Sequence, residues 1–241
     1  MRLIILLILL ISTEAFTQQS KDWLDGLENP KDTFFDGLKS ENQLTKYIEH
    51  DLSELLMPRT EFFGYIGFDY RRIKVSITSI NKNENIPNQY TVSGKTTVFN
   101  NTCDFEGTIT FEQFREFVNM NYGLDSMYSN SGFKSQGVVI GKYLFSENAR
   151  QNHVGVFEGI MTLWWYVDKN GTIKYNDLSS YSDSYKNNQY VGTWSEYGKS
   201  SERPCNWGEH RIPFSGDLDI GAGEFSVNPK YYSKGWEEFK K

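Results

Sequence analysis

Apolar and polar residues alternate along most of this chain with a period of two, the pattern of strands buried on one face. The alternation begins near Glu61, and short polar turns interrupt it. Runs of this kind start at Phe62, Ile73, Tyr90, Phe105, Val138, Val154 and Tyr190, with weaker ones over residues 207–214 and 223–227. The pattern predicts a mainly β domain of antiparallel strands over residues 61–241.

Local signals predict where these strands bend or turn. The apolar positions change parity near Arg71, which predicts a bulge or a turn because a slip of one residue exchanges the two faces of a strand. Asn170-Gly171 tolerates the positive φ of a tight turn, so a hairpin is predicted after Asp168. Residues 160–167 are apolar on both faces, and we expect their strand, Val154 to Val167, to be the longest and to run through the middle of the structure.

Helical spacing occurs in two places. In the first, Ser40 and Gln43 fit a capping box, and Pro58 ends a run of apolar residues spaced three or four apart: Leu44, Tyr47, Ile48, Leu52, Leu55 and Leu56. This run predicts one amphipathic helix over about residues 41–57 that packs on the β domain; the alternative is a helix that binds in a partner's groove. The second run, Phe111 to Val118, predicts a short helix that ends near Gly123.

The first 18 residues have a character of their own. Arg2 is followed by apolar residues 3–11 and a short polar stretch, the pattern of a secretory signal peptide and too short for a membrane span. The alternative is an N-terminal membrane anchor. We expect cleavage near Thr17–Gln19 and a secreted or periplasmic chain with no membrane span in its mature part. The predicted units are a signal peptide (1–18), an N-terminal helical segment (19–60) and an antiparallel β domain (61–241).

The chain has two cysteines, Cys103 and Cys205. An isolated pair in an exported protein predicts a disulfide, which could stabilise the fold by about 4–5 kcal/mol in the chain-entropy model. The alternatives are two free buried thiols or a metal site, and no histidine lies at metal-ligand spacing from either cysteine.

Composition narrows the class of protein. Aromatic residues make up 16% of the chain, enough large apolar side chains to exclude disorder over most of it. Lys and Arg number 25 against 31 Asp and Glu, a net charge of −6. We therefore expect no nucleic-acid partner, because binding to phosphate backbones needs a basic surface.

An aromatic residue followed by glycine two positions later recurs at Phe105–Gly107, Phe157–Gly159 and Tyr190–Gly192. The bare glycine permits strong strand coiling and can be covered by the ring, as barrel closure requires. Gly192-Thr-Trp194, supported by Gly107 and Gly159, resembles the Gly-x-Trp of the calycin barrels, the lipocalin and avidin type. Lipocalins carry it on the first strand, whereas here it lies in the last quarter of the chain. The expected fold is an antiparallel up-and-down barrel or strongly coiled sandwich with an N-terminal amphipathic helix.

Candidate ligand-binding residues lie on the predicted strand that starts at Tyr190. Glu106 and Glu158 have the parity opposite to Phe105 and Phe157 and should face solvent. Glu196, in contrast, shares parity with Tyr190 and Trp194, and an inward carboxylate needs a partner or a ligand. We therefore expect these three residues, Tyr190, Trp194 and Glu196, to line any cavity of the barrel.

No catalytic motif, nucleophile–histidine pair or cofactor-binding loop occurs, and no cofactor is expected. Asp217, Asp219 and Glu224 around a glycine-rich turn are weak candidates for a hard cation, against the alternative of a solvated loop. We expect an exported, non-enzymatic binding protein whose partner is a small molecule or another protein. The alternatives are a secreted carbohydrate-active hydrolase and a structural or envelope-associated protein.

Overall fold

The computed structural model describes residues 18–29 and 37–240. The predicted signal peptide therefore lies outside the described residues, apart from its last residue.

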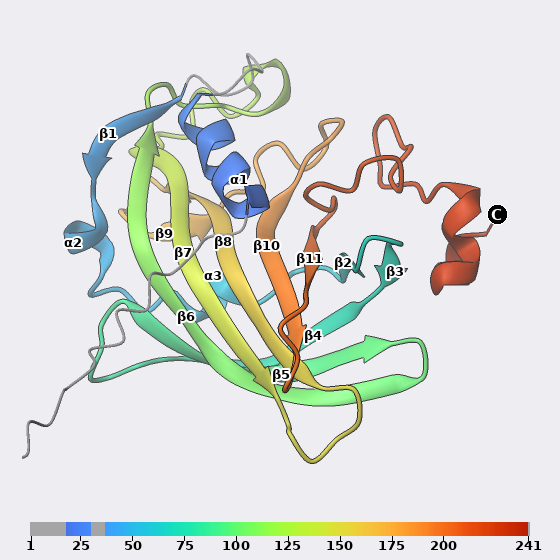
Figure 1. The fold of residues 1–241 in the computed structure, drawn as a ribbon. Helices are drawn as coiled ribbons and strands as arrows, with labels where there is room; N and C mark the ends of the chain where they lie inside the picture. The colour runs from blue at the N-terminus through green and yellow to red at the C-terminus, as the bar shows by residue number, and fades with distance from the viewer. Residues whose placement is uncertain (1–17, 30–36, 241) are drawn as a thin grey trace, which may run out of the picture.

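One antiparallel sheet dominates the fold and is strongly curled (Figure 1). Its strands run in the order β4, β5, β6, β7, β8, β10, β11, β2, β3, so that neighbours in sequence are neighbours in space. Their bounds are β2 (Phe62–Ile66), β3 (Arg71–Arg72), β4 (Lys74–Lys82), β5 (Gln89–Val98), β6 (Asn101–Phe117), β7 (Ser135–Glu147), β8 (Gly155–Val167), β10 (Asn187–Glu196) and β11 (Glu202–Glu209).

The two ends of this sheet nearly meet. β11 pairs with β2, β2 pairs with β3, and β3 leads into β4 after the single residue Ile73. The β2–β3 pairing extends over only two residue pairs, Tyr65 with Arg72 and Ile66 with Arg71. Among the described strands, β4 pairs with neither β2 nor β3, so the barrel is not closed at this seam. The prediction of a mainly β, up-and-down, barrel-like fold is confirmed, and the parity change near Arg71 is the turn between β2 and β3.

Two short strands extend the sheet. β1 (Leu38–Asn42) pairs with the end of β6, and β9 (Ile173–Tyr175) pairs with the end of β8. The turn between β8 and β9 contains Asn170-Gly171, as predicted. β6, with 17 residues, is longer than β8, with 13 residues, so the expectation that β8 is the longest strand was wrong.

Aromatic rings fill the interior of the barrel and lie over glycines of the neighbouring strands. Tyr143 on β7 faces Gly159 on β8, which in turn pairs with Gly192 on β10. A Cβ at Gly192 would lie 2.5 Å from the Tyr143 hydroxyl, so only glycine leaves room for this ring. The ring next to Gly192 thus comes from β7, two strands away, and not from the aromatic residue two positions earlier in β10.

α1 (Gln18–Glu28) packs on the outer wall of the barrel, across β8 and β10 (Figure 1). The Ser20 hydroxyl donates to the Val191 carbonyl at 3.2 Å, and Trp23 Nε1 donates to Thr162 Oγ1 at 3.3 Å. Ile160, on the outward face of β8, is buried. The wall formed by β8 and β10 thus has one apolar face toward the core and another that other segments of the same chain cover. This explains why residues 160–167 are apolar on both faces.

The predicted helix over 41–57 is wrong in its length. The structure has two separate turns of helix, α2 (Leu44–Tyr47) and α3 (Ser53–Leu56), and Ser40 lies in β1. Between them, Lys82 Nζ donates to the Ile48 carbonyl at 2.6 Å, so the backbone bonds to barrel side chains instead of continuing the helix. Tyr47, Leu52 and Leu56 are nevertheless buried, Leu44 and Leu55 pack half-buried against the same core, and together they close one end of the barrel.

The predicted helix over 111–118 is also wrong, because β6 continues to Phe117. A register shift lies between Phe111 and Gln113 in the pairing with β7. This bulge turns both Phe111 and Phe114 toward the core. Two inward residues three apart imitate helical spacing, which is why the pattern was misleading.

The chain after β11 forms a second small core against the outside of β2. Tyr65, Ile212, Leu218, Val227 and Trp236 are buried together, next to the 3₁₀ turns η2 (Pro229–Lys234) and η3 (Glu237–Phe239). The weak strand predicted over 223–227 is reduced to one bridge, between Asp219 and Val227. None of the helices described here is long and apolar enough to cross a membrane.

Candidate functional site

The candidate site is a cavity at the end of the barrel opposite α2 and α3. The turns β2–β3, β5–β6, β7–β8 and β10–β11 surround it, and its volume is about 940 Å³. We call this cavity the cup. Its floor is formed by Ile73, Thr96, Glu147, Phe157 and Trp194, and its rim includes Phe68, Phe99, Glu196, Lys199 and Arg203.

The floor contains the buried carboxylate of Glu147, which lies at the end of β7 and is only 6% exposed. Its Oε1 accepts from the Thr96 hydroxyl. Its Oε2 accepts from the Gly155 backbone N–H at 2.9 Å and from Trp194 Nε1 at 3.0 Å. These contacts come from three different strands besides β7, so the carboxylate ties the floor of the cup together.

The charged groups of the rim are arranged around Trp194. The Glu196 carboxylate accepts from Lys199 Nζ at 2.5 Å, and this hydrogen bond lowers the pKa of Glu196. Arg203 lies directly opposite Trp194 in the pairing of β10 with β11, and its guanidinium sits 5.5 Å from the centre of the indole ring. The polar and charged groups thus surround a wall that is aromatic.

Two phenylalanines stand at the rim with little cover. Phe68 is 83% exposed, in the turn between β2 and β3. Phe99, in the turn between β5 and β6, is 52% exposed and holds the left-handed backbone conformation, with φ of 51°. Apolar surface gathered beside a cavity is typical of ligand-binding grooves. The positive φ of Phe99 follows from its place as the first residue of the two-residue turn between Val98 and Asn101.

The three residues predicted to line a cavity lie at different depths along the barrel axis. Trp194 and Glu196 both line the cup, at its floor and its rim. Tyr190 is fully buried deeper in the barrel, stacked on Trp207 with the ring centroids 4.9 Å apart, and it does not line the cup. Glu106 and Glu158 are exposed on the outer face, as predicted.

Sequence reasoning missed Glu147. The residue follows an apolar strand and precedes the polar turn 148–153, so it reads as an ordinary solvated strand end. Its parity is that of Tyr143 and Phe145, both inward, and this parity was the available signal.

The structure does not contain the predicted disulfide: Cys103 and Cys205 are free, and both are buried. Between β6, which carries Cys103, and β11, which carries Cys205, lie β7, β8 and β10 on one side of the barrel and β5, β4, β3 and β2 on the other. The two backbones therefore lie on opposite walls, while a disulfide needs Cα atoms within about 7 Å. Burial, and then the charge of Glu147, raises the pKa of both thiols.

The weak cation candidates after β11 are used in another way. Arg211 donates to the Asp219 carboxylate at 2.6 Å and to the carbonyls of Gly221 and Gly223, so it holds the glycine-rich loop in place. Asp217 pairs with Lys230. No group of three or more His, Cys, Asp or Glu side chains suited to a metal occurs in the part of the chain that the structure describes, and Glu224 belongs to no such group.

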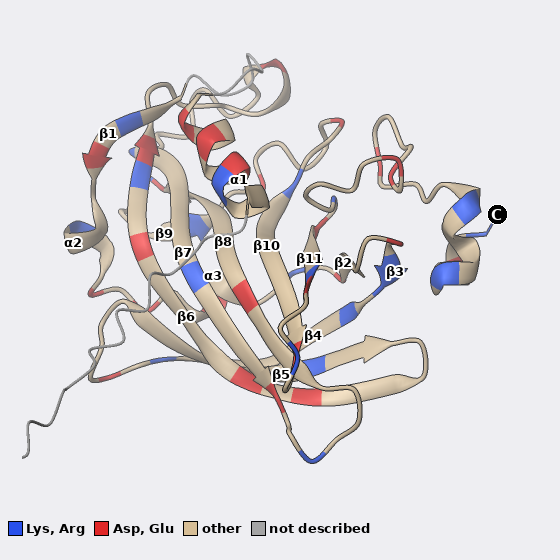
Figure 2. Cartoon of the chain, viewed as in Figure 1, with Lys and Arg blue, Asp and Glu red and all other residues tan. Residues whose placement is uncertain are grey.

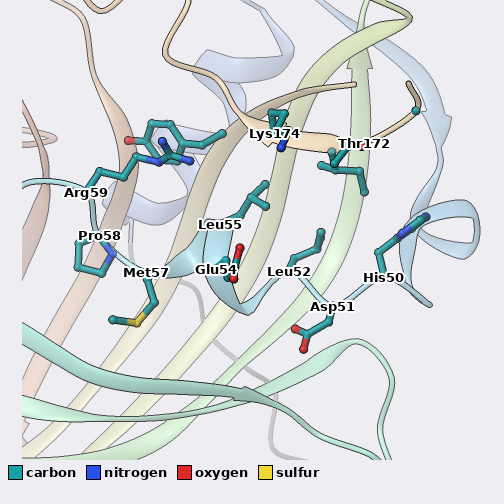
Figure 3. Close-up of a pocket in the computed structure, with 13 residues that line it drawn as sticks. His50, Asp51, Leu52, Glu54, Leu55, Met57, Pro58, Arg59, Thr172 and Lys174 are labelled. Atoms are coloured by element: carbon teal, nitrogen blue, oxygen red, sulfur yellow. The ribbon is translucent and has the colours of Figure 1, made fainter. Parts of the chain in front are cut away.

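A second hollow, of about 590 Å³, lies at the closed end between residues 50–59 and the β9 hairpin (Figure 3). There the Arg59 guanidinium covers the Tyr175 ring, 4.5 Å from its centre. Beside it, Glu209 is completely buried. Its carboxylate accepts hydrogen bonds from the backbone N–H groups of Arg59 and Thr60, from the Tyr175 hydroxyl and from the Asn188 side-chain amide. The polar groups here stabilise the junction between the segment and the barrel.

No protein-family model, curated protein or solved structure matches this chain.

Proposed function

We propose that this protein binds a small organic molecule in the cup. The observation that carries the proposal is the combination, at the open end of the barrel, of an aromatic floor with one buried carboxylate and a rim that exposes Phe68 and Phe99. Ligand sites in proteins are concave, largely apolar and contain a few directed polar groups. The mouths of small β-barrels are a frequent place for them.

We further propose that the chain is an exported, calycin-like binding protein. The signal-peptide pattern of residues 1–18 supports export, and the sequential pairing of strands supports the likeness to up-and-down barrels. Figure 2 shows acidic and basic residues interspersed along the strands of the barrel, and the chain as a whole carries a net charge of −6.

A fluorescence titration with the uncharged dye N-phenylnaphthylamine tests the proposal. We expect saturable enhancement of the dye's emission with one site per chain. Phe68→Ser should weaken binding about three- to tenfold, because a rim contact is lost. Tyr181→Ser is the matched control, since Tyr181 is 82% exposed but lies in a loop outside the cup. No saturable binding, or equal effects of the two substitutions, would refute the cup as the binding site.

Glu196 supplies a second arm of the same test. Glu196→Gln removes the negative charge that Lys199 now neutralises, which leaves an unpaired cation at the rim. We expect the affinity for a charged ligand to change while the melting temperature stays within about 1 °C, because an ion pair at the surface with one exposed partner, Lys199, contributes little to stability.

Hydrolysis of a carbohydrate is the rival function, because Glu147 and Glu196 line the same cup. A glycosidase needs one carboxylic acid with a raised pKa to protonate the leaving group. The pKa of Glu196 is lowered by Lys199, and Glu147 is already bonded to three donors. These environments favour binding over catalysis.

A further inference from the structure

Glu147 is a buried carboxylate that lacks a cationic partner. All three of its donors are neutral: a threonine hydroxyl, a backbone N–H and an indole N–H. Among the described residues, no Lys or Arg side chain forms an ion pair with it. A buried charge that is hydrogen-bonded but not neutralised is costly, and a counter-charge recovers part of that cost.

Its hydrogen bonds also leave room for another donor. The Oε2 atom accepts two hydrogen bonds, from Gly155 and Trp194, whereas Oε1 accepts one, from Thr96. A carboxylate offers about four acceptor positions. Because Glu147 lines the cup, a ligand N–H can approach the remaining position from the cavity.

The aromatic wall beside this carboxylate already holds a cation. The Arg203 guanidinium lies over the Trp194 ring, and Arg203 is exposed. Its charge helps to lower the pKa of Glu196, but among the described residues it forms no direct ion pair. Phe157 stands next to Trp194 with the two ring centroids 6.5 Å apart. Ring faces attract cations, and they attract organic ammonium groups most strongly when water is excluded. An exposed arginine can swing away from the ring at little cost.

We propose that the ligand of the cup carries a protonated amine on an apolar or aromatic body. The ammonium group lies against Glu147 and donates a hydrogen bond to its Oε1, and the body packs on Trp194 and Phe157. This inference rests on the proposed function, since it takes the cup as the binding site.

Displacement of bound N-phenylnaphthylamine by three matched competitors tests the charge preference. Phenethylamine is cationic, phenylethanol is neutral and phenylpropionate is anionic, and all three have similar size. We expect the amine to displace the dye at about tenfold lower concentration than the alcohol, and the carboxylate to be weakest. An equal ranking, or a preference for the carboxylate, overturns this inference but leaves the proposed function standing. Failure of the dye to bind refutes the proposed function itself.

Glu147→Gln then identifies the group responsible. We expect the preference for phenethylamine over phenylethanol to fall about tenfold while the dye still binds. Glu158→Gln is the matched control, because Glu158 is exposed on the outer face of β8 and should leave the preference unchanged. Retention of the preference in Glu147→Gln contradicts the inference. If that variant does not fold, the ranking of the three competitors on the unaltered protein decides.

Discussion

At the scale of single residues, the barrel depends on a buried carboxylate near each end, and Glu209 is the more deeply enclosed. Replacing it with glutamine puts an amide N–H₂ against neighbours that are themselves donors. We expect Glu209→Gln to lower the free energy of unfolding by about 3 kcal/mol, since buried donors lose their acceptor. Urea denaturation measures this loss. Glu202→Gln, an exposed change on the same strand, should stay within about 0.5 kcal/mol. Equal midpoints for the two variants would contradict a structural role for Glu209.

The two cysteines make a second residue-scale prediction. Because both thiols are buried and their pKa values are raised, we expect almost no reaction with Ellman's reagent in the native protein at pH 8. After unfolding in guanidinium without reductant, two thiols per chain should react. If none reacts until a reductant is added, the cysteines form a disulfide in solution and the arrangement of the barrel walls described above is wrong.

At the scale of elements, Glu116 joins β1 and α2 to the long strand β6. Its carboxylate accepts from Lys39 at 3.0 Å and from Lys46 at 3.2 Å. Burial alone would raise the pKa of Glu116, but these two hydrogen bonds outweigh it, and the pKa is lowered. A lowered pKa in the folded state means that the ionised carboxylate stabilises the fold above its unfolded pKa, about 4.3. That stabilisation is lost as the pH falls through the folded value.

Urea denaturation of Glu116→Gln across the acid range checks this. We expect the variant to be less stable than the wild type at pH 7 and the difference to vanish as the pH falls below about 4. Glu106→Gln, an exposed change on the same strand, is the control and should show no such pH-dependent difference. A difference that persists unchanged at acid pH would mean that the glutamate acts through packing and not through its charge.

At the scale of the whole molecule, the strand pattern was largely readable from sequence because alternation reports burial directly. The parity change near Arg71 was predicted correctly for the same reason, whereas the turn at Asn170-Gly171 was predicted from the tolerance of these residues for positive φ. The bulge before Gln113 was not, since two inward phenylalanines on either side of a bulge look like one helical face. The site was predicted only in part. Parity placed Trp194 and Glu196 on the cavity side of their strand. Tyr190 has the same parity but lies deeper along the barrel axis, away from the cup. This depth depends on how neighbouring strands are staggered, so the sequence of one strand does not reveal it.

The hydrogen-bond donors to Glu147 could not be predicted from the sequence for a related reason. Thr96, Gly155 and Trp194 come from β5, β8 and β10, and only the curling of the sheet brings their donors to one point. Cys103 and Cys205 are kept apart by the strands that lie between β6 and β11. Long-range contacts of this kind depend on which strands become neighbours, whereas alternation reports only which face each strand presents.

Deletion of α1 tests whether the outer wall of the barrel can be altered without an effect on binding in the cup. α1 covers the outward face of β8 and β10, with Ser20 fully buried and Trp23 bonded to Thr162, while the cup opens at one end of the interior. A chain that starts at residue 29 loses this cover and exposes apolar wall residues such as Val191 and Ile160 to water. We expect its melting temperature to fall by about 5 °C or more, because exposing two buried aliphatic side chains costs about 3 kcal/mol. The affinity for N-phenylnaphthylamine, measured below the transition, should stay within about twofold of the longer chain. An unchanged melting temperature would show that α1 is not part of the folded wall, and a lost affinity would show that the dye binds outside the barrel, under α1, and not in the cup.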